Sequence, residues 1–291
     1  MLIVFTLVGI PVALNFHNVR WPRGFEPKGR LARLIRRLDS WFIRTQAKGA
    51  AGCSPECTIQ ARADGADALP FFLWTGQFNS DGFEPDRKPA QDGYFHVLFA
   101  GRVERNKGVF DLVEMARIIR TRPELKVMFD VCGDGSDLEA LRAAVMEADV
   151  ANDVIVHGRL ERTALLQAYA RAHVVIVPTR GNFCEGMPLV CAEAMLSGRP
   201  VITSRLSNAL PVIGAAVIEA QPESPSSYVA AIERLARNPA EWINLQAATV
   251  PCRQQFLDRS RSYPVALDQL MALVENESRQ PLAYRHLFNE G

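Results

Sequence analysis

Short apolar runs recur along the chain, and segments whose apolar residues have helical spacing lie between them. The runs that we predict as strands are PVALNF (11–16), AAGCS (50–54), LPFFLW (69–74), YFHVLFA (94–100), VMFDVC (127–132), DVIVHG (153–158), VVIVP (174–178) and GRPVITS (198–204). Continuous apolar runs such as VVIVP are typical of parallel strands that are buried on both faces. Strands that alternate with helices in this way predict an α/β protein built on doubly wound parallel sheets.

The polar, proline-bearing stretch 75–93 interrupts this alternation and predicts a linker. Before it, we expect helices over 30–49 and 55–63. The predicted division of the chain is a first α/β domain at 1–84 with the linker reaching about residue 93, a second domain at 94–265, and a C-terminal helix and loosely ordered tail at 266–291.

The first segment, MLIVFTLVGIPVAL, carries no charged side chain. It lacks the basic flank of a signal peptide and is too short to span a bilayer. We therefore expect a buried element of the α/β domain that leads into the strand 11–16.

Composition narrows the class of protein. Of 291 residues, 48% are hydrophobic and 22% charged, which is typical of a soluble globular protein, and the net charge of +1 gives no reason to expect a nucleic-acid partner. The six cysteines form no CxxC pair, and the five histidines lack ligand spacing, so we expect no metal site. This use of cysteine is typical of a reducing cytoplasm.

The stretch 20–48 is strongly basic, with nine Lys and Arg residues against Glu26 and Asp39. Its apolar residues recur at helical spacing: Leu31, Leu34, Ile35, Leu38, Trp41 and Phe42. An amphipathic basic helix of this kind suits anionic lipid headgroups or a lipid-phosphate acceptor at the inner face of a membrane. A helix that covers a sheet and happens to have an arginine-rich outer face would show the same pattern. Both interpretations stay open here.

Two glutamates, Glu185 and Glu193, flank the start of a helix that we expect to begin at Pro188. Ligands of open parallel sheets bind beyond the carboxyl ends of the strands, so Glu185 should lie on a loop at the mouth of a site. Glu193 should lie about two turns into the helix. The free N–H groups around Met187 and Leu189 suit a phosphate. The same spacing would arise if Glu185 were only a charged residue on a loop and Glu193 an ordinary helix residue. The spacing alone therefore does not establish a site.

The loop after YFHVLFA carries two cations between glycines. Gly101 ends the strand, Arg102 follows it, and Lys107 precedes Gly108 at the start of the next helix. A guanidinium is a planar fork and an ammonium a point charge, and together they suit a diphosphate.

These motifs follow one another in a definite order: GR…KG, CGDG, HG, Y…VVIVP, E-x7-E and GRPVI. The ordered set resembles the donor-binding domain of retaining GT-B glycosyltransferases of family four, over residues 94 to about 265. The strand PVALNFHN and the segments after it resemble the second half of that family's N-terminal domain. The resemblance implies a GT-B-like architecture of two Rossmann-like parallel-sheet domains, and we expect the N-terminal one to be incomplete.

The resemblance also implies a reaction, in which a sugar passes with retention and without a metal from a nucleotide-diphosphate-sugar to a saccharide or lipid-linked acceptor. The nucleotide-sugar is then a substrate, and no cofactor is implied. By the same resemblance, Glu185 meets the sugar hydroxyls, Glu193 meets the ribose hydroxyls, and His17 faces the sugar from the other domain. The residues expected to border the nucleotide are Gly133, Gly158 and Arg159.

Two departures from the family leave alternatives open. After the strand VITS the family has a glycine pair and a glutamate, whereas this chain has Ser207, Asn208 and Val212. The family's glycine-rich acceptor-side loop has no counterpart. A non-catalytic nucleotide-sugar-binding half-enzyme or gene fragment, completed by a partner chain, is therefore the alternative. A nucleotide-sugar epimerase shares the architecture, but GR…KG and E-x7-E favour a transferase.

Overall fold

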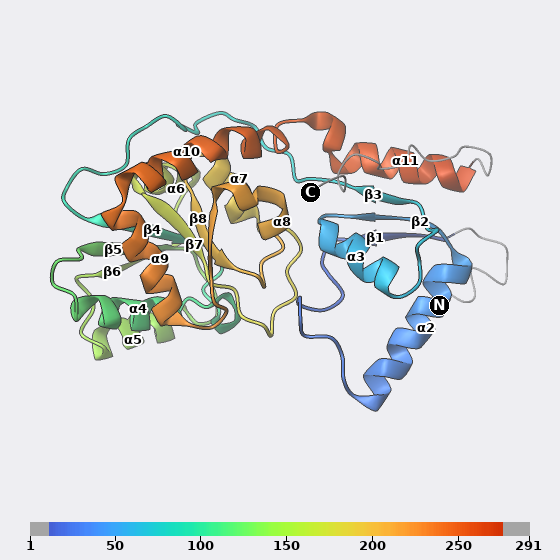
Figure 1. Ribbon diagram of the computed structural model, residues 1–291, viewed down its shortest axis with the longest axis horizontal. Coiled ribbons are helices and arrows are strands. Elements are labelled where there is room, and N and C mark those ends of the chain that lie inside the picture. Colours follow the sequence, from blue (N-terminus) through green and yellow to red (C-terminus); the bar gives the residue numbers. More distant parts are fainter. Residues whose placement is uncertain (1–11, 276–291) are drawn as a thin grey trace.

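The computed structural model describes residues 12–275, which form two α/β units joined by a long linker (Figure 1). The predicted buried segment before residue 12 and the predicted tail beyond residue 275 lie outside the described residues. The C-terminal helix, which was predicted to follow the second domain from residue 266, is present as α11 (Tyr263–Glu275).

The first sheet has three described strands, all parallel, in the order β1 (Val12–Phe16), β2 (Ala47–Gly52) and β3 (Phe71–Leu73). The helix expected over 30–49 was too long, because α2 (Arg30–Gln46) ends where β2 begins. Residues from Ala47 onward pair with β1, and this pairing prevails over the helical pattern of the sequence.

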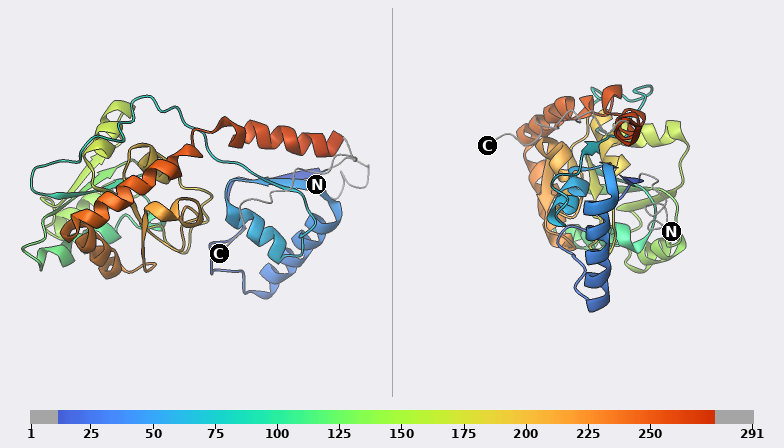
Figure 2. Two further views of the ribbon diagram at one scale, coloured as in Figure 1. Left: turned by 45° about the horizontal axis from the view of Figure 1, so that its top comes forward. Right: turned by 90° about the vertical axis from the view of Figure 1, so that its right-hand side faces the viewer.

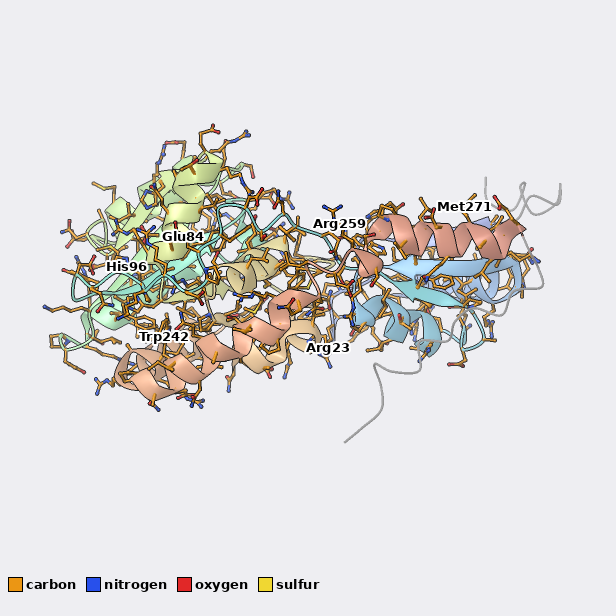
Figure 3. The ribbon with its side chains drawn as sticks, turned by 90° about the horizontal axis from the view of Figure 1, so that it is seen from above. Arg23, Glu84, His96, Trp242, Arg259 and Met271 are labelled. Carbon is orange, nitrogen blue, oxygen red and sulfur yellow. The ribbon has the colours of Figure 1, made fainter. Side chains whose placement is uncertain are left out.

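Helices cover both faces of the first sheet (Figure 1). On one face lies α3 (Pro55–Ala63), with the predicted bounds. On the other lies α11, whose Leu270 packs with Ala51 and Phe72. Seen from above, the chain leaves the second unit near Arg259 and α11 then runs along the first sheet (Figure 3). The last described helix therefore completes the core of the first unit.

Within the described part of the chain, the second sheet has six parallel strands in the order β6-β5-β4-β7-β8-β9. Their bounds are β4 (Phe95–Ala100), β5 (Val127–Cys132), β6 (Val154–Gly158), β7 (Val174–Val177), β8 (Val201–Ser204) and β9 (Val217–Ala220). The strand order reverses between β4 and β7, and ligands of doubly wound sheets bind at such a switch point. The loops after these two strands are the ones in which the sequence predicted the diphosphate and sugar residues.

Two layers of helices enclose this sheet (Figures 1 and 2). One core packs against α4 (Asp111–Arg120), α5 (Leu138–Glu147) and α9 (Pro225–Arg237). The core on the other face packs against α6 (Arg162–Arg171), α7 (Leu189–Leu196) and α10 (Pro239–Gln254). The remaining elements are the short helices α8 (Leu210–Ile213), η1 (Arg105–Lys107), η2 (Gly214–Ala216) and η3 (Arg259–Arg261).

The linker is held against the second unit by a buried arginine. Arg199 is 0% exposed, and it donates to the carbonyl of Arg87 in the linker at 2.5 Å and to the carbonyls of Tyr169 and Ala170 at 3.1 and 3.0 Å. Burial lowers the pKa of this guanidinium to about 10. Three carbonyl acceptors offset part of the cost of that burial, whereas Nη1 is buried without a hydrogen-bond partner. The bond to the Arg87 carbonyl ties the linker to the second unit.

Candidate functional site

The loop after β4 carries both predicted diphosphate cations. The strand ends just before Gly101, and Arg102 and Glu104 lead to η1, whose last residue is Lys107. The Phe183 ring lies beside both cations, 4.0 Å from Lys107 Nζ and 5.7 Å from Arg102 Cζ. The Arg102 side chain is 59% exposed and donates to Glu104 Oε1 at 2.7 Å. Most of this guanidinium is therefore open to a ligand.

The predicted sugar carboxylate lies on the loop between β7 and α7, as its position in the sequence indicated. Lys107 Nζ donates to Oε1 of Glu185, and Thr179 Oγ1 donates to Oε2 at 3.1 Å. The side-chain amide of Asn208 donates to the carbonyl oxygen of Glu185. Asn208, one of the departures from the family pattern, is buried and thus supports the loop that carries this carboxylate.

The helix that follows begins one residue later than expected. Pro188 has the extended conformation of an N-cap (φ −62°, ψ 116°), and α7 starts at Leu189. The first backbone bond of the turn runs from Cys191 N to Pro188 O at 3.0 Å, so the N–H groups just before Cys191 remain free for a ligand. The Leu189 side chain is 59% exposed beside these donors.

The predicted ribose carboxylate is partly buried on α7. The Tyr169 hydroxyl donates to Oε2 of Glu193 at 2.7 Å. Burial raises the pKa of Glu193, and the hydrogen bond from Tyr169 and the positive charge of Arg162 oppose that rise. Glu193 is thus a largely desolvated acceptor whose orientation Tyr169 determines.

A cavity of about 450 Å³ contains Glu193 and most of the predicted nucleotide-bordering residues. Its walls include Gly101, Gly133 and Arg159. A Cβ at Gly133 would come within 1.7 Å of the Gly101 carbonyl oxygen, so only glycine fits there. Gly158 lies behind this wall, where its carbonyl accepts from Gly133 N at 2.8 Å.

A second cavity of about 370 Å³ lies between the two units and contains His17, Lys107, Glu185 and Met187. His17 directly follows the last residue of β1. The centre of its ring lies 5.4 Å from that of Trp74 and 5.5 Å from that of Tyr263. The Asn15 amide nitrogen is 2.9 Å from His17 Nε2. The ring is therefore held by side chains from β1, from the segment after β3 and from the start of α11.

Asn18 and Gly186 join the two units across this cavity. The Gly186 N–H donates to Asn18 Oδ1 at 3.2 Å. A Cβ at Gly186 would lie 2.3 Å from the His17 carbonyl oxygen and 2.6 Å from Cys53 Sγ. The loop that carries Glu185 thus approaches the first unit closely because residue 186 is glycine.

Ten of the eleven predicted site residues line these two cavities, and Gly158 is the exception. The cavities adjoin, because Arg102 and Leu189 line both. Sequence reasoning missed the residues that hold the site together: Asn18, Trp74, Tyr169, Thr179, Asn208 and Tyr263. Tyr169 stood in a recognised motif and Asn18 directly follows His17, but no local pattern indicates that Tyr263 reaches the site.

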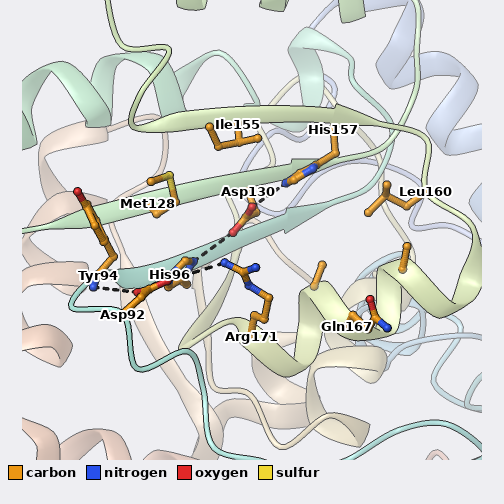
Figure 4. A pocket seen from close by; sticks show the side chains of 12 residues that line it. Asp92, Tyr94, His96, Met128, Asp130, Ile155, His157, Leu160, Gln167 and Arg171 are labelled. Carbon is orange, nitrogen blue, oxygen red and sulfur yellow. Dashed lines mark hydrogen bonds and ion pairs between the residues drawn. The ribbon is translucent and has the colours of Figure 1, made fainter.

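Another cavity, of about 460 Å³, lies on the second unit beside β4, β5 and β6 (Figure 4). His96 lies 3.0 Å from the Asp92 carboxylate and 3.4 Å from that of Asp130, and His157 Nε2 lies 2.6 Å from Asp130. Asp92 belongs to the end of the linker, so this network fastens the linker to the sheet. Among residues 12–275, no group of His, Cys, Asp or Glu is arranged to hold a metal ion.

Solved glycosyltransferase structures share this architecture over most of the chain. Anabaena Alr3699/HepE, solved with UDP and glucose, aligns with 94% of this chain and 74% of its own, with a TM-score of 0.67 at 15% identity. Sucrose-phosphate synthase from Thermosynechococcus elongatus aligns with 90% of this chain and 67% of its own, with a TM-score of 0.66 at 20% identity. The predicted GT-B-like fold with two Rossmann-like domains is confirmed.

Residues 94–238 match the family Glycosyl transferases group 1. The matched segment includes every predicted residue of the donor side, from Gly101 to Glu193. The second unit is therefore a glycosyl transferases group 1 domain, as the order of the motifs indicated.

Curated relatives match the chain over part of its length. D-inositol 3-phosphate glycosyltransferase of Pseudarthrobacter chlorophenolicus is 29% identical over 188 residues, which are 63% of this chain and 44% of the relative. The 2-deoxystreptamine N-acetyl-D-glucosaminyltransferase of Streptomyces fradiae is 29% identical over 217 residues, which are 68% of this chain and 49% of the relative. The chain thus spans less than half the length of these two relatives.

Proposed function

We propose that this chain is a glycosyltransferase that moves a sugar from a nucleotide-diphosphate-sugar to a saccharide or lipid-linked acceptor, with retention and without a metal ion. The observation that carries the proposal is the junction of the two cavities at Arg102 and Leu189. A nucleotide in the cavity of Glu193 and a sugar in the cavity of Glu185 bring the diphosphate to this junction.

Departure of the nucleoside diphosphate is the step that the residues at the junction assist. As the bond from the anomeric carbon to the phosphate oxygen breaks, negative charge develops on the leaving diphosphate. Lys107 and Arg102 supply positive charge, and the free N–H groups at the start of α7 supply aligned donors. These groups are present before the ligand arrives, so little reorganisation accompanies the reaction.

The two carboxylates bind opposite ends of the donor in this proposal. Ionised Glu193 accepts hydrogen bonds from the ribose hydroxyls, and its contact with Tyr169 orients it. Glu185 accepts from hydroxyls of the transferred sugar, and its ion pair with Lys107 couples sugar recognition to the diphosphate. His17 faces the same cavity from the first unit, where it contacts the sugar.

The relatives indicate which donors to test first. The Anabaena structure contains UDP and glucose, and the Streptomyces relative is named as an N-acetyl-D-glucosaminyltransferase. UDP-glucose and UDP-N-acetylglucosamine are therefore the first choices. All six cysteines lie within the described residues as free thiols, which supports a reducing compartment such as the cytoplasm.

The direct test is to measure release of nucleoside diphosphate from a panel of nucleotide-sugars, with and without a chelator, and to determine the anomeric configuration of the product by NMR. The proposal expects release that the chelator leaves unchanged and a product with the donor's configuration. Inversion, or full loss of activity with the chelator, would contradict the mechanism.

A binding chain that needs a partner is the second candidate. The observation that favours it is the size of the first sheet, in which three strands are described against six in the second. Tight binding of a nucleoside diphosphate without release or transfer from any donor would favour this candidate. Turnover by the chain alone would exclude it.

A further inference from the structure

Most of the apolar side chains of α2 face away from the protein. Leu31 is 71% exposed, Leu34 is 54% exposed and Leu38 is 58% exposed, and Ile35 and Trp41 are also exposed. The buried side chains of α2 are confined to its last turns, at Ser40, Phe42 and Ile43. The helix extends beyond the sheet and away from both units (Figures 1 and 2). A sheet-covering role therefore does not explain this stripe of apolar residues.

A row of arginines accompanies the stripe. Arg30, Arg33, Arg37 and Arg44 recur at intervals that place them along one side of the helix. Between α2 and the end of α3, a cavity of about 730 Å³ is lined by Arg33, Arg36, Arg37 and Arg44 together with Ser40 and Asp64.

Only part of this positive charge is compensated by acidic residues. Arg36 pairs with Glu26 and Asp64, and Arg20 also pairs with Asp64. Within residues 12–275, the side chains of Arg30, Arg33 and Arg37 have no hydrogen-bond or ion-pair partner. The cavity thus contains one buried carboxylate, Asp64, and two cations without an acidic partner, Arg33 and Arg37.

The charge of the chain is divided unevenly as a result. Residues 20–48 contain nine basic and two acidic side chains, a formal charge of +7, whereas the whole chain has +1, so the other residues together carry −6. An anionic surface would attract this segment and repel the rest of the molecule.

We propose that α2 docks on the surface of an anionic lipid bilayer, with its apolar stripe among the upper acyl chains and lipid phosphates in the arginine-lined cavity. An apolar face with arginines beside it and a tryptophan near one end is suited to the membrane interface. No helix within residues 12–275 is long and apolar enough to cross a bilayer, so the contact is peripheral. The docking goes beyond the proposed transfer reaction and does not depend on it.

Flotation of the full chain with vesicles tests the proposal. Vesicles of phosphatidylglycerol and phosphatidylcholine should bind the chain, vesicles of phosphatidylcholine alone should bind it at least about tenfold more weakly, and added salt should reduce the difference. Arg30→Gln, Arg33→Gln and Arg37→Gln combined should weaken binding about a hundredfold. Leu31→Ser with Leu38→Ser should weaken it about tenfold or more.

Matched controls come from exposed residues of the second unit. Met146→Ser with Ile243→Ser removes apolar side chains that are 70% and 56% exposed, and Arg117→Gln, Arg142→Gln and Arg234→Gln combined removes as many charges. These variants should bind vesicles like the unchanged chain. Circular dichroism and nucleoside diphosphate affinity should be the same for all the variants.

Several outcomes would overturn the proposal. Equal binding to both kinds of vesicle would show that charge is irrelevant, and controls as weak as the α2 variants would show that α2 is not the contact. Complete displacement by inorganic phosphate, compared with chloride at equal ionic strength, would make the cavity a site for free anions. Self-association that the α2 substitutions abolish, without vesicle binding, would make the partner a second copy of the chain.

Discussion

The ammonium of Lys107 donates a hydrogen bond to the carboxylate of Glu185, although the two residues are 78 positions apart. Lys107 comes from the loop after β4 and Glu185 from the loop after β7, the two strands at which the sheet order reverses. In the proposed donor complex this pair joins the diphosphate end of the site to the sugar end. Substitution of Lys107 should therefore affect every ligand that contains the diphosphate, whereas substitution of Glu185 should affect only ligands that also contain the sugar.

Removal of either cation should weaken diphosphate binding. Lys107→Ala and Arg102→Ala each remove a charge-assisted contact, so the affinity for a nucleoside diphosphate should fall about ten- to a hundredfold. Calorimetry with the nucleoside alone should show little change. Arg105→Ala, which removes a neighbouring cation that pairs with Asp137, is the control. Equal losses for nucleoside and diphosphate would show that the two cations are structural.

The two carboxylates should separate nucleotide binding from sugar binding. Glu193→Gln replaces an ionised acceptor at the ribose with a neutral amide and should weaken every nucleotide ligand, by about tenfold or more. Glu185→Gln should spare the nucleoside diphosphate and weaken the complete nucleotide-sugar. Calorimetry with both ligands on both variants makes the comparison. The reverse pattern would mean that the two roles are interchanged.

Nucleotide binding should weaken on acidification as Glu193 becomes protonated. This loss should occur at a higher pH than it would for a carboxylate with an ordinary pKa. Burial raises the pKa of Glu193 above its usual 4.5, and the hydrogen bond from Tyr169 limits that rise. Tyr169→Phe removes the donor that favours the ionised form, so the midpoint of the affinity profile should move to higher pH. A profile that Tyr169→Phe does not move would exclude Glu193 as the titrating group.

The contact between Asn18 and Gly186 should matter for transfer more than for nucleotide binding. Gly186→Ala places a methyl group 2.3 Å from the His17 carbonyl oxygen, so the loop and the first unit must separate. Donor turnover should fall about tenfold or more, whereas nucleoside diphosphate affinity should change little, because the nucleotide cavity belongs to the second unit alone. Asn18→Ala, which removes only the hydrogen bond, should have a smaller effect. An effect confined to nucleotide affinity would contradict this division.

The linker network predicts a loss of stability as the pH rises through the raised pKa of His96. A hydrogen bond with Asp130 raises the pKa of His96 against the opposing effect of burial, and Asp92 adds to the rise. The stabilisation is complete below the usual histidine value of 6.5 and is lost as the pH rises through the higher pKa of the folded state. Urea unfolding midpoints measured below pH 6.5 and above the folded-state pKa of His96 should differ in the unchanged chain. In His96→Gln the two midpoints should be nearly equal. An unchanged difference in His96→Gln would assign the effect to another group.

Much of the second unit could be predicted from the sequence. Its central strands β4, β7 and β8 are buried on both faces and therefore appear as short apolar runs. The loops after β4 and β7 carry the cations, glycines and carboxylates that indicated the site. The cations at 102 and 107 and the glutamates at 185 and 193 were placed correctly on their loops and helix for this reason. The start of α7 was displaced by one residue, because proline suits both the N-cap and the first helical position.

The contacts between these pieces were decided by the tertiary structure. Periodicity determines which face of an element is apolar, but it does not show what covers that face. The stripe of α2 is exposed although its pattern also suits a sheet-covering helix, and β2 takes residues from the predicted helix because β1 pairs with them. Tyr263 reaches His17 only because α11 returns to the first sheet. Such partners depend on packing between segments remote in sequence, which local preferences do not encode.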